Sequence, residues 1–113
     1  MLEPMSEPLF LSLTIWRARR AIKRLVRRYC PRAKLFSFGA TWIDPRYLAI
    51  WIATETDDER DRLRAMPDLI DAFRQALGDA GYPPAAIPEV GFEFESEETV
   101  RRDYGGNWFH RTK

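Results

Sequence analysis

The stretch from residue 17 to residue 34 contains nine basic residues and no acidic one. A run this basic folds stably only if apolar residues recur at a spacing that lets one side of it be buried. That condition is met over residues 11–29. Plotted at 100° per residue, seven of them fall on one side of a helix: Leu11, Ile15, Ala18, Ile22, Leu25, Val26 and Tyr29. The sequence therefore predicts an amphipathic helix.

This helix has identifiable ends and a basic outer side. Ser12 is a suitable N-cap, and Pro31 prevents the helix from continuing much beyond Tyr29. The side opposite the apolar residues carries six cations and one aromatic residue: Trp16, Arg17, Arg20, Lys23, Arg24, Arg27 and Arg28. We expect these seven residues to form a partner-binding surface.

The remaining charges balance the basic run without surrounding it. Residues 35–100 hold fourteen acids against five bases, so the whole chain has a formal net charge of only +1. Total charge therefore favours neither a nucleic acid nor a membrane as partner. Local fields steer association, and this segregation is the most informative feature of the sequence.

Two strands are expected to follow the helix. Apolar and polar residues alternate over residues 34–43, Asp44-Pro45-Arg46 is typical of a turn, and residues 47–54 are almost all apolar. Strands that are apolar on both faces usually lie in the middle of a sheet. We predict a hairpin whose second strand is central.

A second helical region is predicted over residues 56–81. Thr56 and Glu59 have the spacing of a capping box. Apolar residues keep helical spacing on both sides of Pro67, so either one helix kinks there or a second helix starts with Pro67 at its first position. The acidic residues at the start of this helical region would lie beside the basic helix.

The C-terminal third is predicted to contain a strand, a short helix and a closing strand. Val90, Phe92 and Phe94 alternate with acids, which predicts a strand with one buried and one solvated, acidic face. Ser96 caps a helix over residues 97–104, which Gly105-Gly106 ends. Residues 107–112 are expected to form a closing strand.

These elements predict an α+β fold. We expect a mainly antiparallel sheet of three or four strands with helices packed on one face, in the order α-β-β-α-β-α-β. Residues 1–113 form one domain, in which residues 1–10, with Pro4 and Pro8, are an irregular lead-in.

The composition supports a globular, cytoplasmic protein. Hydrophobic residues make up 45% of the chain, with four Trp, four Tyr and seven Phe, whereas a disordered chain lacks such residues. A single Cys excludes an internal disulfide and suits a reducing compartment. The apolar stretch from Leu9 to Trp16 is too short to span a membrane, and its cations follow it, unlike those of a secretory signal.

A second candidate surface lies near the C-terminus. Residues 101–110 combine two glycines with polar and aromatic side chains that could contact a partner: Tyr104, Asn107, Trp108 and His110. The alternative is a helix C-cap that leads into an edge strand whose Trp108 packs in the core.

The sequence offers little for catalysis. Cys30 and His110 are the only residues of their types, and their spacing matches no nucleophile motif. Glu89, Glu93 and Glu95 share one strand face and could hold a divalent cation, but a solvated face is the better interpretation. We expect no metal, no cofactor and no small-molecule substrate.

We therefore predict a non-catalytic binding module. The leading hypothesis is protein–protein recognition through the basic helix, the acidic strand face or both, including self-association of the opposite patches. In size and charge segregation the chain is similar to small bacterial binding proteins such as toxin-neutralising immunity proteins, or to adaptors. The alternative is RNA or DNA binding by the Arg-rich helix over residues 16–34, with Trp16 stacking on a base. A third interpretation is a solvated face neutralised by the neighbouring acidic helix.

Overall fold

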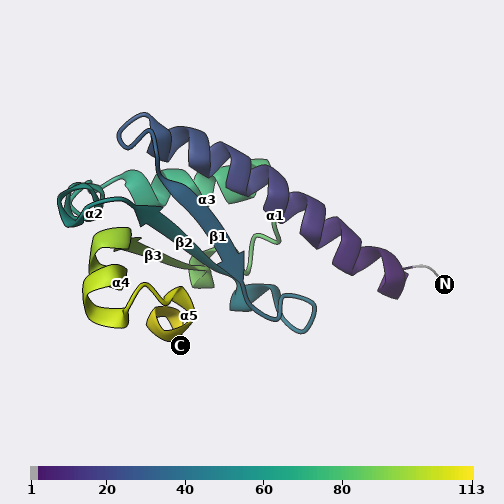
Figure 1. Ribbon diagram of the computed structural model, residues 1–113. Coiled ribbons are helices and arrows are strands. Elements are labelled where there is room, and N and C mark those ends of the chain that lie inside the picture. The colour runs from purple at the N-terminus through teal and green to yellow at the C-terminus, as the bar shows by residue number, and fades with distance from the viewer. Residues whose placement is uncertain (1–2) are drawn as a thin grey trace.

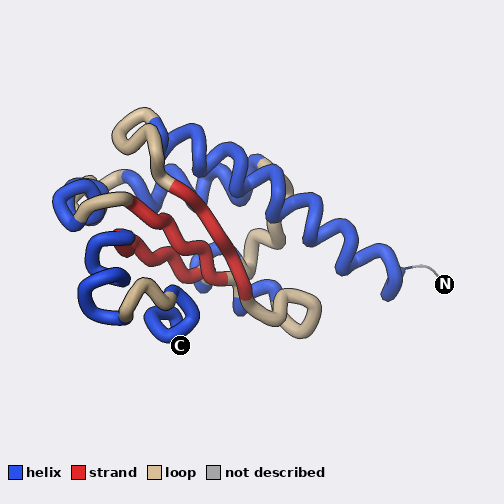
Figure 2. The backbone as a smooth tube through the Cα atoms, in the orientation of Figure 1, coloured by secondary structure: helices blue, strands red, loops and turns tan. Residues whose placement is uncertain are grey.

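The structure, a computed structural model, describes the backbone of residues 3–113 and the side chains of residues 9–113. Helices pack around one three-stranded sheet (Figures 1 and 2). Its elements, in chain order, are α1 (Glu3–Arg27), β1 (Lys34–Phe38), β2 (Ala49–Thr54), α2 (Asp57–Arg64), α3 (Leu69–Asp79), β3 (Gly91–Ser96), α4 (Glu97–Tyr104) and α5 (Trp108–Thr112), with short 3-10 turns at Pro45–Tyr47 and Ile87–Glu89.

Helix α1 is longer than the sequence predicts. It begins at Glu3, so the irregular lead-in is wrong for residues 3–10, Ser12 is not an N-cap, and residues 1–2 lie outside the described part of the chain. Pro4 falls in the first turn, where a helical amide has no partner to lose, and the helix continues through Pro8. The N-terminal turns of α1 extend beyond the rest of the molecule (Figure 1).

The predicted apolar side of α1 forms one wall of the core. Ala18, Ile22 and Val26 are fully buried, and the other predicted residues of that side are partly buried, except Tyr29. Tyr29 is exposed because α1 ends at Arg27 and the following turn carries it away from the helical stripe.

The predicted hairpin is confirmed. Strands β1 and β2 pair antiparallel with Phe36 opposite Trp51, and β2 is the central strand. However, β1 ends at Phe38 rather than residue 43. Gly39 has a φ of 126°, and a Cβ at that position would lie 2.0 Å from the main-chain oxygen of Tyr47. The chain therefore leaves the sheet in a tight turn that only glycine allows.

The prediction of a mainly antiparallel sheet is wrong, because β3 pairs parallel to β2 and makes the sheet mixed. Residues 55–90 form a helical crossover that returns the chain to the end of the sheet where β2 began, and parallel pairing requires such a connection. The α+β class itself is confirmed.

Pro67 separates two helices instead of kinking one. The predicted capping box of Thr56 and Glu59 starts α2, and α3 begins at Leu69, two residues after the proline. Pro67 thus lies in the connection and not at the first position of the second helix. The aromatic ring of Phe73 on α3 packs against β3, which places α3 and α1 on the same face of the sheet.

The predicted helix over residues 97–104 is confirmed as α4, with Ser96 at its N-cap and Gly105 in the left-handed conformation at its C-cap. The predicted closing strand is wrong, because residues 108–112 form the helix α5. The Asn107 side chain accepts a hydrogen bond from the amide of His110 at 3.1 Å and so starts this helix.

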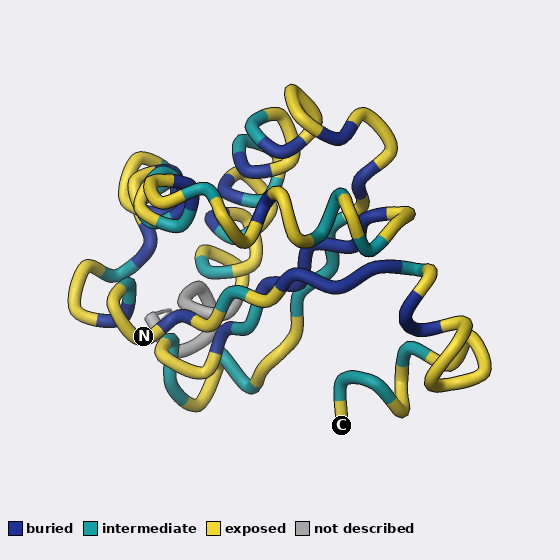
Figure 3. The backbone as a smooth tube through the Cα atoms, turned by 90° about the vertical axis from the view of Figure 1, so that its left-hand side faces the viewer, coloured by how far each residue is buried: buried dark blue, intermediate teal, exposed yellow. Residues whose placement is uncertain are grey.

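Helix α5 packs on the face of the sheet opposite α1 and α3, so the helices do not all lie on one face. Trp108 meets the ring of Phe36 edge-on at 5.4 Å, and Arg111 lies over the ring of Trp51. No residue from Arg101 to Lys113 is buried (Figure 3). The main core is therefore between the sheet and the α1–α3 layer.

Candidate functional site

The outer side of α1 is accessible over its whole described length. All six predicted cations are exposed, and the Trp16 side chain is 52% exposed. The Arg20 guanidinium lies 4.9 Å from the centre of the Trp16 ring, which forms a cation–π pair on the helix surface.

The cations on this surface have no acidic partner within the described residues. Every salt bridge found there involves other bases, and the nearest in sequence joins Arg32 to Glu55 at 3.6 Å. The expected neutralisation by the acidic helix fails for a geometric reason. The break at Pro67 separates the acids of α2 from α3, and α3 is the helix that packs along α1.

Two arginines of α1 also make hydrogen bonds within the fold. Arg19, which was not among the predicted site residues, donates to the main-chain oxygen of Leu35 at 3.1 Å. Arg27, which was among them, donates from Nε to the oxygen of Ala33 at 3.0 Å while its side chain stays exposed. Arg19 also covers part of the free edge of β1, which protects that edge from pairing with another strand.

Two exposed apolar side chains that were not predicted extend the same surface. Leu9 is 73% exposed and Leu13 is 47% exposed. At 100° per residue they point the same way as Trp16 and Arg20. The signal was present, since the helical wheel extends back to residue 9, but the two prolines near the N-terminus suggested an irregular segment.

The second predicted group lies on the other face of the sheet, so the structure does not bring the two groups together (Figure 1). Asn107 caps α5, Trp108 packs on Phe36, and Tyr104 lies 5.8 Å from the Arg111 guanidinium. These contacts hold α5 in place. His110 is exposed, and its imidazole makes no hydrogen bond to any described residue.

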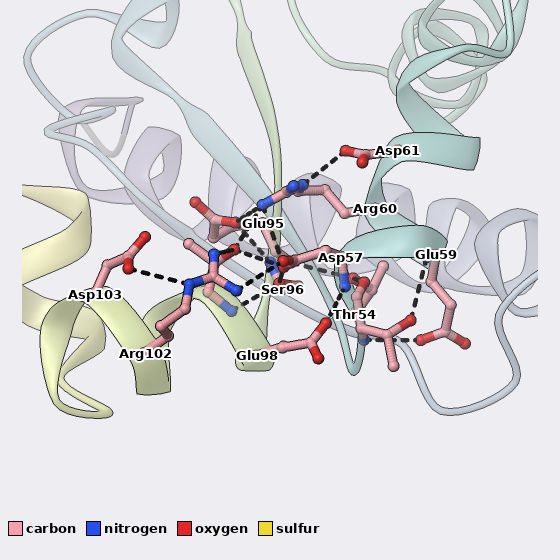
Figure 4. A network of polar contacts seen from close by, with 12 residues as sticks. Thr54, Asp57, Glu59, Arg60, Asp61, Glu95, Ser96, Glu98, Arg102 and Asp103 are labelled. Atoms are coloured by element: carbon pink, nitrogen blue, oxygen red, sulfur yellow. Dashed lines mark hydrogen bonds and ion pairs between the residues drawn. The ribbon is translucent and has the colours of Figure 1, made fainter.

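The predicted acidic strand face is wrong at its most important position. Glu93 is exposed, but the Glu95 side chain is only 3% exposed. Glu95 accepts hydrogen bonds from Arg60 on α2 at 2.9 Å and from Arg111 on α5 at 2.5 Å (Figure 4 shows the Arg60 contact). Alternation along the strand puts both acids on one face, and the C-terminal segment then covers only one of them.

Asp57 organises the neighbouring polar network in Figure 4. Its carboxylate accepts hydrogen bonds from the hydroxyls of Ser96 and Thr99 and from Arg102 at 3.0 Å. The hydroxyl donors first, and then Arg102 and Arg60, hold the pKa of Asp57 well below its usual range. This network joins the N-termini of α2 and α4, so its charges stabilise the fold and are not available to a partner.

The only cysteine has the surroundings of a core residue. Cys30 is buried, and burial raises the pKa of its thiol, which reduces the thiolate fraction at neutral pH. Cys30 belongs to the core on the α1 side of the sheet, whereas His110 lies on α5 on the opposite side.

A further exposed apolar group lies in the turn between β1 and β2, where Trp42, Ile43 and Tyr47 are all exposed. The two charged residues of this turn, Asp44 and Arg46, pair with each other at 2.6 Å, so the exposed apolar side chains have no free charge beside them as those of α1 have. None of the helices in the described part of the chain combines the length and hydropathy that a bilayer span requires.

The outer side of α1 is therefore the surface of the described residues that best fits a partner. It joins exposed apolar side chains to exposed cations on one rigid element. The chain matches no protein-family model, and it has no significant similarity to a curated protein or to a solved structure.

Proposed function

We propose that this protein is a non-catalytic recognition module that binds another protein through the outer side of α1. One observation carries the proposal: Leu9, Leu13 and Trp16 are exposed on the same side of α1 as cations that pair with no acid among the described side chains. Aromatic residues and arginines are enriched where proteins bind one another, and an apolar centre gives such contacts their free energy.

The two parts of the surface would contribute differently. Cations that pair with no acid in residues 9–113 attract an acidic surface over several ångströms, which raises the association rate and makes it depend on ionic strength. The exposed leucines and Trp16 lose contact with water only in the final complex, so they mainly slow dissociation. An acidic protein surface next to an apolar patch is the expected partner.

Nucleic-acid binding is the second candidate. The unneutralised cations and the adjacent Trp16 favour it, because phosphates release counterions when they contact such a helix. Leu9 and Leu13 favour a protein instead, since exposed leucines have no counterpart on a phosphate backbone. Self-association through the acidic strand face is no longer part of the proposal, because Glu95 is buried.

Photo-crosslinking tests the proposal directly. Benzoylphenylalanine in place of Leu13 should form a protein adduct in the cells that produce the chain. The same group in place of Arg101, an exposed residue of α4, should not. Arg20→Glu combined with Lys23→Glu should abolish the adduct. An equal yield at both positions, or no adduct at all, would refute the proposal.

A mobility-shift titration separates the second candidate. The purified protein and labelled RNA or DNA are mixed at low salt, where electrostatic binding is strongest. We expect no retention of the nucleic acid. Retention that falls steeply with salt and disappears in the Arg20→Glu, Lys23→Glu variant would assign the surface to a nucleic acid instead.

A further inference from the structure

The exposed residues of α1 follow a regular spacing. Successive members of one exposed line are separated by four, three, four, three and four residues: Leu9, Leu13, Trp16, Arg20, Lys23 and Arg27. We call this line the outer seam. Alternation of three and four is the spacing of the contact positions in a coiled coil, and it keeps one stripe facing a partner helix over many turns. The outer seam covers about 27 Å at 1.5 Å per residue.

The outer seam changes its chemistry halfway along. Its first three members are apolar and its last three are cations, all of them exposed. Arg17 and Arg24 flank it on the side of α3, where they line a groove with Ala72 and Asp79, and the buried Val26 lies on the other side, toward the core. A helix that lies on the seam would therefore meet an apolar surface at one end and positive charge at the other.

A second copy of this chain is a poor occupant in either orientation. In a parallel pair, the three cations of one seam would face the three cations of the other. In an antiparallel pair, they would face Leu9, Leu13 and Trp16 and would lose water without gaining a counter-charge, which is costly. The distribution of charge along the seam thus acts against self-association.

We propose that the outer seam binds one amphipathic helix of a different protein, apolar at one end of its contact stripe and acidic at the other. The acidic end lies over Arg20, Lys23 and Arg27, and the apolar end over Leu9, Leu13 and Trp16. This inference rests on the proposed function and specifies the partner of the same surface. An acidic residue on the edge of the partner helix nearest α3 also meets Arg17 and Arg24.

Synthetic helical peptides of three heptads test the inference. One carries Leu at its first three contact positions and Glu at the last three, and a second has the reverse order. A third has the same composition with Leu and Glu alternating. All other positions are Ala or Gln. Binding of each labelled peptide to the full chain is measured by fluorescence anisotropy.

One of the two ordered peptides should bind at least about tenfold more tightly than the alternating peptide. Which one binds reports whether the helices run parallel or antiparallel. Leu13→Asp and Arg20→Glu should each weaken binding at least about tenfold, since each removes a contact from one half of the seam. Arg101→Glu, on α4 and outside the outer seam, should leave it unchanged.

Several results would overturn the inference. Equal binding of the ordered and alternating peptides would mean that net charge alone acts. A dimer in analytical ultracentrifugation that Leu13→Asp abolishes would make the occupant a second copy. Binding to vesicles that contain phosphatidylserine, without peptide binding, would assign the seam to an anionic lipid surface. If no peptide binds but crosslinking at position 13 still gives a protein adduct, the helical partner is overturned and the proposed function is retained.

Discussion

The buried carboxylate of Glu95 gives the sharpest test of how the C-terminal segment is held. Glu95→Gln removes the charge and keeps the shape. The wild-type side chain accepts hydrogen bonds from Arg60, Arg111 and the amide of Ser96, and it is almost completely shielded from water. Breaking a buried ion pair by removing one partner costs about 3–5 kcal/mol.

We expect a loss at the lower end of that range, about 3 kcal/mol. Arg60 keeps an ion pair with Asp61 at 3.0 Å, and Arg111 keeps its position over the ring of Trp51 at 5.1 Å. For a domain of this size, the midpoint of thermal unfolding falls about 3–6 °C per kcal/mol, so the expected decrease is roughly 9–18 °C.

Glu93→Gln is the matched control, because Glu93 lies two residues earlier on the same face of β3 and is exposed. It should change the free energy of unfolding by less than about 0.5 kcal/mol. Urea unfolding followed by Trp fluorescence measures both variants. Equal, small losses would show that Glu95 is solvated, as simple alternation along the strand predicts, and would refute the reasoning.

Three further predictions concern the fold and the surface. Gly39→Ala should cost about 3 kcal/mol or more in urea unfolding, because its φ is 126° and a main-chain oxygen occupies the place of a Cβ; Gly91→Ala, with open space, should be nearly neutral. Since the folded pKa of Asp57 is depressed, its contribution is complete above about pH 4 and is lost as the pH falls further. Between pH 6 and pH 3, the midpoint of thermal unfolding should therefore fall less for Asp57→Asn than for the wild type. An equal fall in both proteins would contradict the network. Arg20→Glu with Lys23→Glu should change the free energy of unfolding by less than about 1 kcal/mol, and a larger loss in urea would mean that these cations serve folding.

Local patterns in the sequence predicted the parts of the fold that local physics decides. The buried stripe of α1, the capping box of Thr56 and the Ser96 cap depend on residues within four positions of one another. The central position of β2 was also predictable, since a strand that is apolar on both faces requires cover on both.

The errors concern contacts between distant segments. The parallel pairing of β3 depends on where the α2–α3 crossover returns the chain. Glu93 and Glu95 have the same local pattern, and the contacts of Glu95 with Arg60 and Arg111, both distant in sequence, distinguish them. Helix α5 is too short to have a periodic signal, and its cap at Asn107 together with packing on the sheet decides its form.

The candidate site was predictable in part. The cations of α1 were identified from the helical wheel, because charge and periodicity agree there. Trp16 was identified with them, but Leu9 and Leu13 were not. Pro4 and Pro8 suggested an irregular segment before the helix, which left Leu9 out, and Leu13 lies inside the predicted helix without having been assigned to its outer side. Proline is tolerated in a first turn, which accounts for Pro4, whereas Pro8 lies further inside α1. The group around Trp108 looked like a recognition loop, but its unusual residues hold α5 on the sheet.

Amide chemical-shift mapping tests the central claim, that the outer side of α1 is the docking surface. The isotope-labelled chain is titrated with the better of the two ordered peptides. We predict that the perturbed amides lie along residues 9–27 of α1 and that α2 and α4 are unaffected. Perturbations gathered instead on the turn that exposes Trp42 and Ile43, or spread over the whole surface, would contradict the claim.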